Sequence, residues 1–118
     1  MRTFILLSLT ACAVILSNCK KEAIDVVDCS GTTPTYTANI KSIMDRDCAG
    51  SGCHSSSAKR SGYDLSSYAG VSTAAKSKAF LGAIQHKSGY SKMPKGASKL
   101  SDADVKTVTC WVQNNMPE

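Results

Sequence analysis

The sequence predicts an all-α protein. Three stretches after residue 34 carry apolar side chains at intervals of three and four residues, the spacing of a half-buried helix. Serine or threonine residues that can cap a helix precede these stretches. Alternation of apolar and polar residues, the pattern of a strand, persists nowhere after residue 19. With 118 residues and no internal repeat, the chain has room for one domain.

Residues 1–18 are expected to be a lipoprotein signal peptide. Arg2 supplies a positive start, and the apolar stretch at 4–16 has signal length but is too short to span a bilayer comfortably. It ends in Leu-Ser-Asn before Cys19, which resembles a bacterial lipobox with Cys19 as the first mature residue and the site of lipidation. More than one acyl chain would be needed for stable anchoring.

Two other interpretations of this segment exist. Cys12 fits the same local pattern, but cleavage there would leave only about six apolar residues, too few for a signal peptide. An ordinary secretory signal followed by a stray cysteine is the second. In every case we expect export, and with lipidation the protein would face the periplasm or the cell surface of a bacterium, anchored to the membrane.

Residues 19–34 are expected to be a lipid-anchored tether, and residues 35–118 the folded domain. The segment has no helical period, and Ser30 to Pro34 is typical of turns and coil. A flexible chain of about 15 residues has a root-mean-square reach of roughly 20 Å. The domain would therefore stand clear of the membrane.

The first helix is expected to begin near Thr33, Pro34 and Thr35, where hydroxyls can cap and proline suits the first turn. It runs directly into Cys48. Its apolar face comprises Tyr36, Ile40, Ile43 and Met44.

Two shorter helices should follow. The stretch at 63–71 contains Ser66, a fair cap for a short helix. A third helical stretch covers about Ser77 to Gln85, and its apolar residues are Phe80, Leu81 and Ile84.

The last helix has the clearest start. Ser101 is the expected cap, Asp104 completes an acidic capping box, and Leu100 can pack onto Val105 as a hydrophobic staple. This helix is expected to pack against the first one. Its inner face comprises Val105, Val108, Thr109 and Val112, with Trp111 at the edge.

Cys48, Cys53 and His54 place two thiols and an imidazole in one short loop. In c-type cytochromes such a cysteine pair forms thioether bonds to haem, and the adjacent histidine ligates the iron. The usual spacing has two residues between the cysteines and this loop has four, but Gly50 and Gly52 would let the extra residues bulge outward. The alternative is a haem-free lipoprotein binding module, stapled by a disulfide or by zinc held with help from Cys110 or His86.

Met93 is the expected second axial ligand of the iron. It stands beside Pro94 in the polar segment 86–99, where a thioether has no obvious packing partner. Methionine is more often core filler, but His/Met ligation is an established haem arrangement. His86 is the rival ligand, or a contact to a haem propionate.

Taken in order, the cysteine loop, the segment Tyr63 to Tyr68, the run Met93 to Gly96 and the segment Leu100 to Trp111 resemble the small class I-type cytochrome c domains of membrane-anchored bacterial lipoproteins. The resemblance covers roughly residues 35–117. It implies a cytochrome c-like fold in which the N- and C-terminal helices cross beside one covalently bound haem c, held by Cys48, Cys53, His54 and Met93.

With both axial positions filled, such a haem suits outer-sphere transfer of single electrons, so we expect a monomeric electron carrier and not an enzyme. The formal net charge of +5 comes mostly from isolated lysines, which argues against nucleic acid and favours a redox partner with an acidic docking face. A positive rim around Met93 is expected from Lys87, Lys92, Lys95 and Lys99.

The number of cysteines predicts one disulfide. Of six cysteines, Cys12 leaves with the signal, Cys19 takes lipid and two take haem. Cys29 and Cys110 remain, and leftover thiols tend to pair in an oxidising compartment. The alternative is two separate thiols, with Cys110 buried as a small apolar residue.

Overall fold

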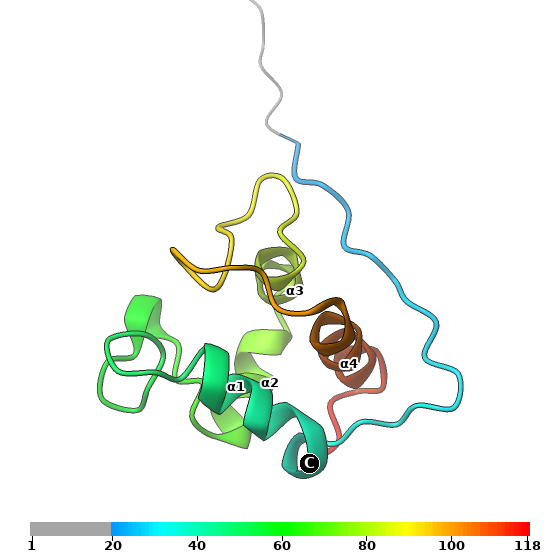
Figure 1. The fold of residues 1–118 in the computed structure, drawn as a ribbon, viewed down its shortest axis with the longest axis horizontal. Coiled ribbons are helices and arrows are strands. Elements are labelled where there is room, and N and C mark those ends of the chain that lie inside the picture. The colour runs from blue at the N-terminus through cyan, green and yellow to red at the C-terminus, as the bar shows by residue number, and fades with distance from the viewer. Residues whose placement is uncertain (1–19) are drawn as a thin grey trace, which may run out of the picture.

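Four α-helices carry the fold in the computed structural model, which describes residues 20–118. The expected signal peptide, Cys12 and the lipidation at Cys19 lie outside these residues. Across the described part of the chain there is no strand, which confirms the all-α class, and no helix long and apolar enough to cross a membrane. The helices are α1 (Lys41–Asp47), α2 (Tyr68–Ala75), α3 (Lys78–Ile84) and α4 (Asp102–Gln113), with a π-helical turn η1 (Tyr36–Ile40) leading into α1 and a 3-10 turn η2 (Arg60–Gly62) before α2 (Figure 1).

Side-chain hydroxyls cap η1, α2, α3 and α4, at Thr35 and Ser101 as expected and with one correction. Thr35, Ser77 and Ser101 each accept a backbone N–H in the first turn that follows them. The cap of α2 is Ser67 and not Ser66, because the Ser66 hydroxyl donates to the Asp64 carboxylate at 2.5 Å.

The predicted apolar faces form one core. All four predicted residues of the first helix are buried, and α4 packs against η1, with the rings of Tyr36 and Trp111 6.4 Å apart. Trp111 is fully buried in the core and not at its edge, and its indole N–H donates to the Pro117 carbonyl at 2.7 Å. Val112 is only partly buried. The largest fully buried side chains are Trp111, Ile40, Met44, Val71, Val108, Thr109 and Cys110.

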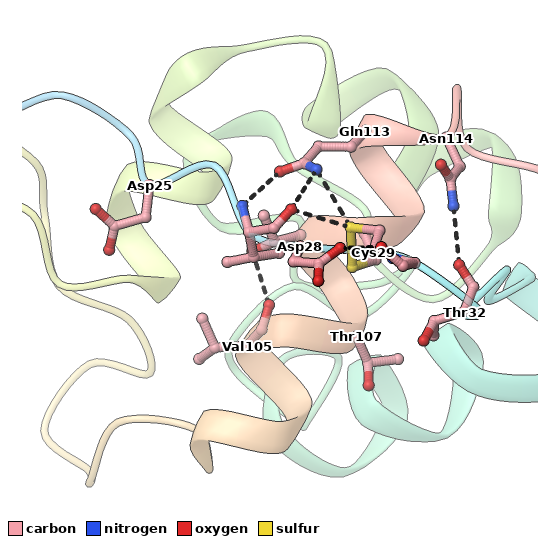
Figure 2. Close-up of a disulfide and its surroundings, with 12 residues drawn as sticks. Asp25, Asp28, Cys29, Thr32, Val105, Thr107, Gln113 and Asn114 are labelled. Atoms are coloured by element: carbon pink, nitrogen blue, oxygen red, sulfur yellow. Dashed lines mark hydrogen bonds between the residues drawn. A yellow bond between two sulfur atoms is a disulfide. The ribbon is translucent and has the colours of Figure 1, made fainter.

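Residues 20–34, which we call the strap, run without helix along the outside of α3 and α4 (Figure 1). A disulfide joins Cys29 to Cys110 in α4, with 5.5 Å between their Cα atoms (Figure 2). This is the pair that the cysteine count predicts. It closes a sequence separation of 81 residues and fixes the middle of the strap to the core.

Two glutamine side chains hold the strap as a partner strand would. The Gln85 amide accepts from the N–H of Asp25 at 2.8 Å and donates to its carbonyl at 3.2 Å. The Gln113 amide does the same for Val27, at 3.1 and 3.0 Å (Figure 2). A primary amide offers a donor and an acceptor side by side, so each glutamine satisfies both backbone groups of one strap residue.

The expectation of a flexible tether at 19–34 is therefore wrong for the described part of it. Backbone groups from Glu22 to Thr32 are bonded to the domain, the last by Asn114 to the Thr32 carbonyl at 3.3 Å. The roughly 20 Å reach of a free chain is not available to a bonded one.

Candidate functional site

The cysteine loop, residues 48–54, begins where α1 ends. The N–H of His54 donates to the Cys48 carbonyl at 3.1 Å, which closes the loop and brings His54 back beside Cys48. Gly52 has a φ of +77°, a conformation that glycine adopts without strain, and Gly50 and Gly52 are exposed. The longer spacing between the cysteines is thus accommodated in an outward turn.

The two thiols of this loop are free, but their surroundings differ. Cys48 is only 9% exposed and belongs to the apolar core, whereas Cys53 is exposed. Burial, aided by the nearby Asp47 carboxylate and Cys53, raises the pKa of the Cys48 thiol to about 11. The thiolate is the reactive form of cysteine, so in this fold the Cys48 thiol is protonated and poorly nucleophilic at neutral pH.

The imidazole of His54 is oriented through Nδ1. This nitrogen lies 3.3 Å from the Tyr63 carbonyl oxygen, and the two rings meet edge to face with centroids 6.3 Å apart. A carbonyl only accepts, so Nδ1 carries a proton, and in the neutral imidazole Nε2 is then the nitrogen with the free lone pair. The N–H of Leu65 also donates to the His54 carbonyl at 2.8 Å, which ties the loop to the segment before α2. Metal-ligating histidines are typically oriented by this kind of hydrogen bond from the other ring nitrogen.

The backbone of Met93 is held from both sides. Its N–H donates to the Ala83 carbonyl at 3.1 Å, and its carbonyl oxygen accepts from His86 Nε2 at 2.9 Å. His86 adopts a φ of +57°, rare for a residue with a side chain, just after α3. The half-buried Met93 side chain is thus carried on a backbone position fixed to the C-terminal end of α3.

The cysteine loop and the Met93 loop lie on the same side of the helices (Figure 1). A cleft of about 370 Å³ separates the end of α1 from residues 94–101. Its lining includes Asp47 and Pro94, the chain neighbours of Cys48 and Met93, although Cys53, His54 and Met93 themselves are not among the lining residues. Arg46 also lines the cleft, and its guanidinium lies 2.6 Å from the carboxylate of Asp47 and 2.8 Å from that of Asp104 in α4.

The expected lysine rim needs one correction. The Lys87 ammonium lies 3.1 Å from a Glu22 carboxylate oxygen and 2.7 Å from one of Asp25, and its side chain is only 15% exposed. It therefore holds the strap and does not face a partner. Lys92 and Lys95 are exposed on either side of Met93, and Lys99 lies 3.6 Å from Asp102.

The residues of the alternative zinc site are not brought together. The Cys110 sulfur is committed to its disulfide and lacks the thiolate that zinc requires. His86 Nε2 is bonded to the Met93 carbonyl. Among residues 20–118, no group of three or more histidine, cysteine, aspartate or glutamate side chains is placed to hold a metal ion.

The sequence gives no sign of two residues that orient the site. Tyr63 acts on His54 through a backbone carbonyl, which any residue type possesses. Ala83 acts on Met93 in the same way. The sequence predicts His86 as a rival ligand, and its neighbourhood of turn residues carries no signal for the bond that it makes to Met93.

Comparisons with known proteins identify no relative. No protein-family model, no curated protein and no solved structure matches the chain.

Proposed function

We propose that this protein is a monohaem c-type cytochrome that carries single electrons at a membrane surface. The observation that supports it is the free thiol pair next to an imidazole whose Nδ1 is held by the Tyr63 carbonyl. The Cys29–Cys110 disulfide removes the other two described cysteines from competition for this role. The proposal includes a cytochrome c-like arrangement, and the packing of α4 against η1 is compatible with it.

The chemistry of the donor set fits haem c. Cys48 and Cys53 would supply the two thioether sulfurs, His54 Nε2 one axial ligand and the Met93 sulfur the other. When bound, haem supplies the one-electron redox couple. The Tyr63 carbonyl keeps His54 in the ligating tautomer and raises its basicity, while His86 and Ala83 fix the Met93 backbone. If His54 and Met93 both ligate the iron, no position would remain for a substrate, which favours a role as an electron carrier and not as an enzyme.

The burial of Cys48 favours one order of assembly. Its thiol lies in the apolar core of the closed domain, and burial raises its pKa. Attachment at Cys48 would therefore precede closure of the core, whereas the exposed Cys53 is accessible at any stage. This order suits haem attachment to a newly exported, still open chain.

The proposed setting is a bacterial membrane surface that faces the periplasm or the cell exterior, with Cys19 as the lipid-bearing residue. Lys92 and Lys95, exposed beside Met93, would guide an acidic redox partner toward the haem edge.

Covalent haem retention tests the proposal. The full chain, produced with a cytochrome c maturation system, should keep a haem absorbance after denaturation, with an intact mass raised by one haem. Cys53→Ser and His54→Ala should reduce the haem content severely, whereas Ser51→Ala, an exposed change in the same loop, should not. A folded wild-type protein that carries no haem after maturation would refute the proposal.

A further inference from the structure

The start of the strap is fixed to the domain directly after residue 21. The N–H of Glu22 donates to the Ser88 carbonyl at 2.9 Å, and the N–H of Ser88 donates to the Glu22 carboxylate at 2.8 Å. The bond from the Ser88 N–H to the carboxylate, together with the Lys87 ammonium, holds the pKa of Glu22 below its ordinary range, so it stays ionised. Lys21 passes so close to Gly89 that an added Cβ there would lie 3.0 Å from the Lys21 Cα.

This attachment leaves very little chain between the domain and the expected anchor. Only Lys20 and Lys21 separate Cys19 from Glu22. Three residue steps span at most about 11 Å when fully extended. A membrane that holds the acyl chains of Cys19 would thus lie close to one particular face of the domain, the one that surrounds the start of the strap.

That face is basic. A groove of about 480 Å³ runs between the strap and α3, and its lining includes Lys21, Lys78 and Tyr90. The Lys21 ammonium lies 5.1 Å from the centre of the Tyr90 ring, and both lysines are exposed. The carboxylate in the lining, Glu22, already pairs with Lys87. Because Glu22 and Asp25 share the one Lys87 ammonium, these three groups carry one net negative charge, against the three positive charges of Lys20, Lys21 and Lys78.

We propose that this face, formed by Lys20, Lys21, Lys78 and Tyr90, lies against anionic phospholipid headgroups of the membrane that holds the anchor. The proposal rests on the lipid anchor of the proposed function but not on haem. Lysines next to a membrane surface are attracted to anionic lipid, and a tyrosine ring suits the boundary between water and lipid. The docked strap converts a single anchoring point into a fixed orientation.

Lysine acetylation followed by mass spectrometry tests the orientation in the full, lipidated chain. The protein is labelled in detergent, in phosphatidylcholine vesicles and in vesicles that also contain phosphatidylglycerol. Lys20, Lys21 and Lys78 should react several-fold more slowly in the anionic vesicles than in detergent. Internal references are Lys59, beyond the cysteine loop, and Lys106, whose charge acts on Asp28 farther along the strap; both should react at unchanged rates.

A charge-reversal pair sharpens the test. Lys78→Glu should restore much of the reactivity of Lys21 in anionic vesicles, whereas Lys106→Glu, an exposed change on α4, should not. A chain that floats with the vesicles but whose Lys21 and Lys78 react as fast as in detergent overturns the proposal alone. A chain that does not float with the vesicles overturns the lipid anchor and this proposal together. Haem content is read independently from absorbance, so neither outcome is confused with a failure of haem attachment.

Discussion

His86 Nε2 lies 2.9 Å from the carbonyl oxygen of Met93, seven residues farther along the chain. The Met93 N–H is bonded to Ala83, so the residue expected to ligate iron has both backbone groups tied to the end of α3. In this structure His86 therefore positions the backbone of Met93. This bond leads to the first prediction.

His86→Ala should lower the free energy of unfolding by about 2 kcal/mol, because it removes the hydrogen bond and places alanine at a φ of +57°. In the haem-bound protein it should also weaken the iron–sulfur absorption band and lower the potential. His86→Asn, which tolerates the backbone conformation, should recover part of the stability but not the band. An unchanged band in His86→Ala would show that Met93 needs no such support.

Met93→Ala should leave haem covalently attached but open the sixth coordination position and lower the potential, since a methionine ligand favours the ferrous state. Binding of imidazole or carbon monoxide, followed by absorbance, measures the open position. Met116→Ala, another partly buried methionine, serves as the control. If Met93→Ala changes neither the potential nor ligand binding, Met93 is not the ligand.

Replacing Cys29 and Cys110 by serine should destabilise the domain by about 4 to 5 kcal/mol in the chain-entropy account, given the separation of 81 residues. The strap should become sensitive to proteases near its middle. Gln113→Ala, which removes one clamp on Val27 but keeps the disulfide, should cost only about 1 kcal/mol. An alkylatable Cys29 in folded, unreduced wild-type protein would contradict the pairing.

The haem-free protein should lose stability in alkaline solution through Cys48. Burial raises its pKa in the folded state to about 11 from the ordinary 9.0, so between these values the unfolded chain releases a proton that the folded protein retains. The free energy of unfolding should therefore be unaffected by this group below pH 9 and fall by about 2 to 3 kcal/mol as the pH rises to 11. Denaturant titrations of wild type and Cys48→Ala measure the difference.

The matched control for Cys48→Ala is Cys53→Ala, which removes the exposed thiol of the same loop. In Cys53→Ala the free energy of unfolding should still fall between pH 9 and 11. In Cys48→Ala the part of this fall that comes from the Cys48 thiol should be absent. Equal declines in wild type and Cys48→Ala would mean that the Cys48 thiol is not buried in solution.

Gly82→Ala should destabilise the protein by about 1 to 3 kcal/mol although alanine favours helices, because its Cβ would lie 2.5 Å from the Tyr90 ring. In a Tyr90→Ala background the same change should be neutral or stabilising, since the ring is gone. Gly50→Ala, where nothing lies within 4 Å, is the control and should have little effect. Additive effects of Gly82→Ala and Tyr90→Ala in thermal melts would rule out this contact.

Local signals in the sequence determined where the helices begin and which faces they bury. Caps such as Thr35 and Ser101 act on backbone groups three residues away, and the face that begins at Tyr36 follows from helical geometry alone. The predicted cap of α2 was wrong by one residue. The Ser66 hydroxyl donates to the Asp64 carboxylate, and the neighbouring Ser67 caps the helix. The candidate haem residues also came from sequence, and haem binding itself stays a prediction.

Only the tertiary structure decided the docking of the strap, the central place of Trp111 and the role of His86. The strap has the composition of a flexible linker, and it is held because Gln85 and Gln113 lie 60 and 86 residues from the strap residues they bind. Such contacts depend on which surfaces the folded core brings together, and no spacing within the strap encodes them. Lys87 is a further example. Its local sequence predicts an exposed charge, but the folded chain pairs its ammonium with Glu22 and Asp25.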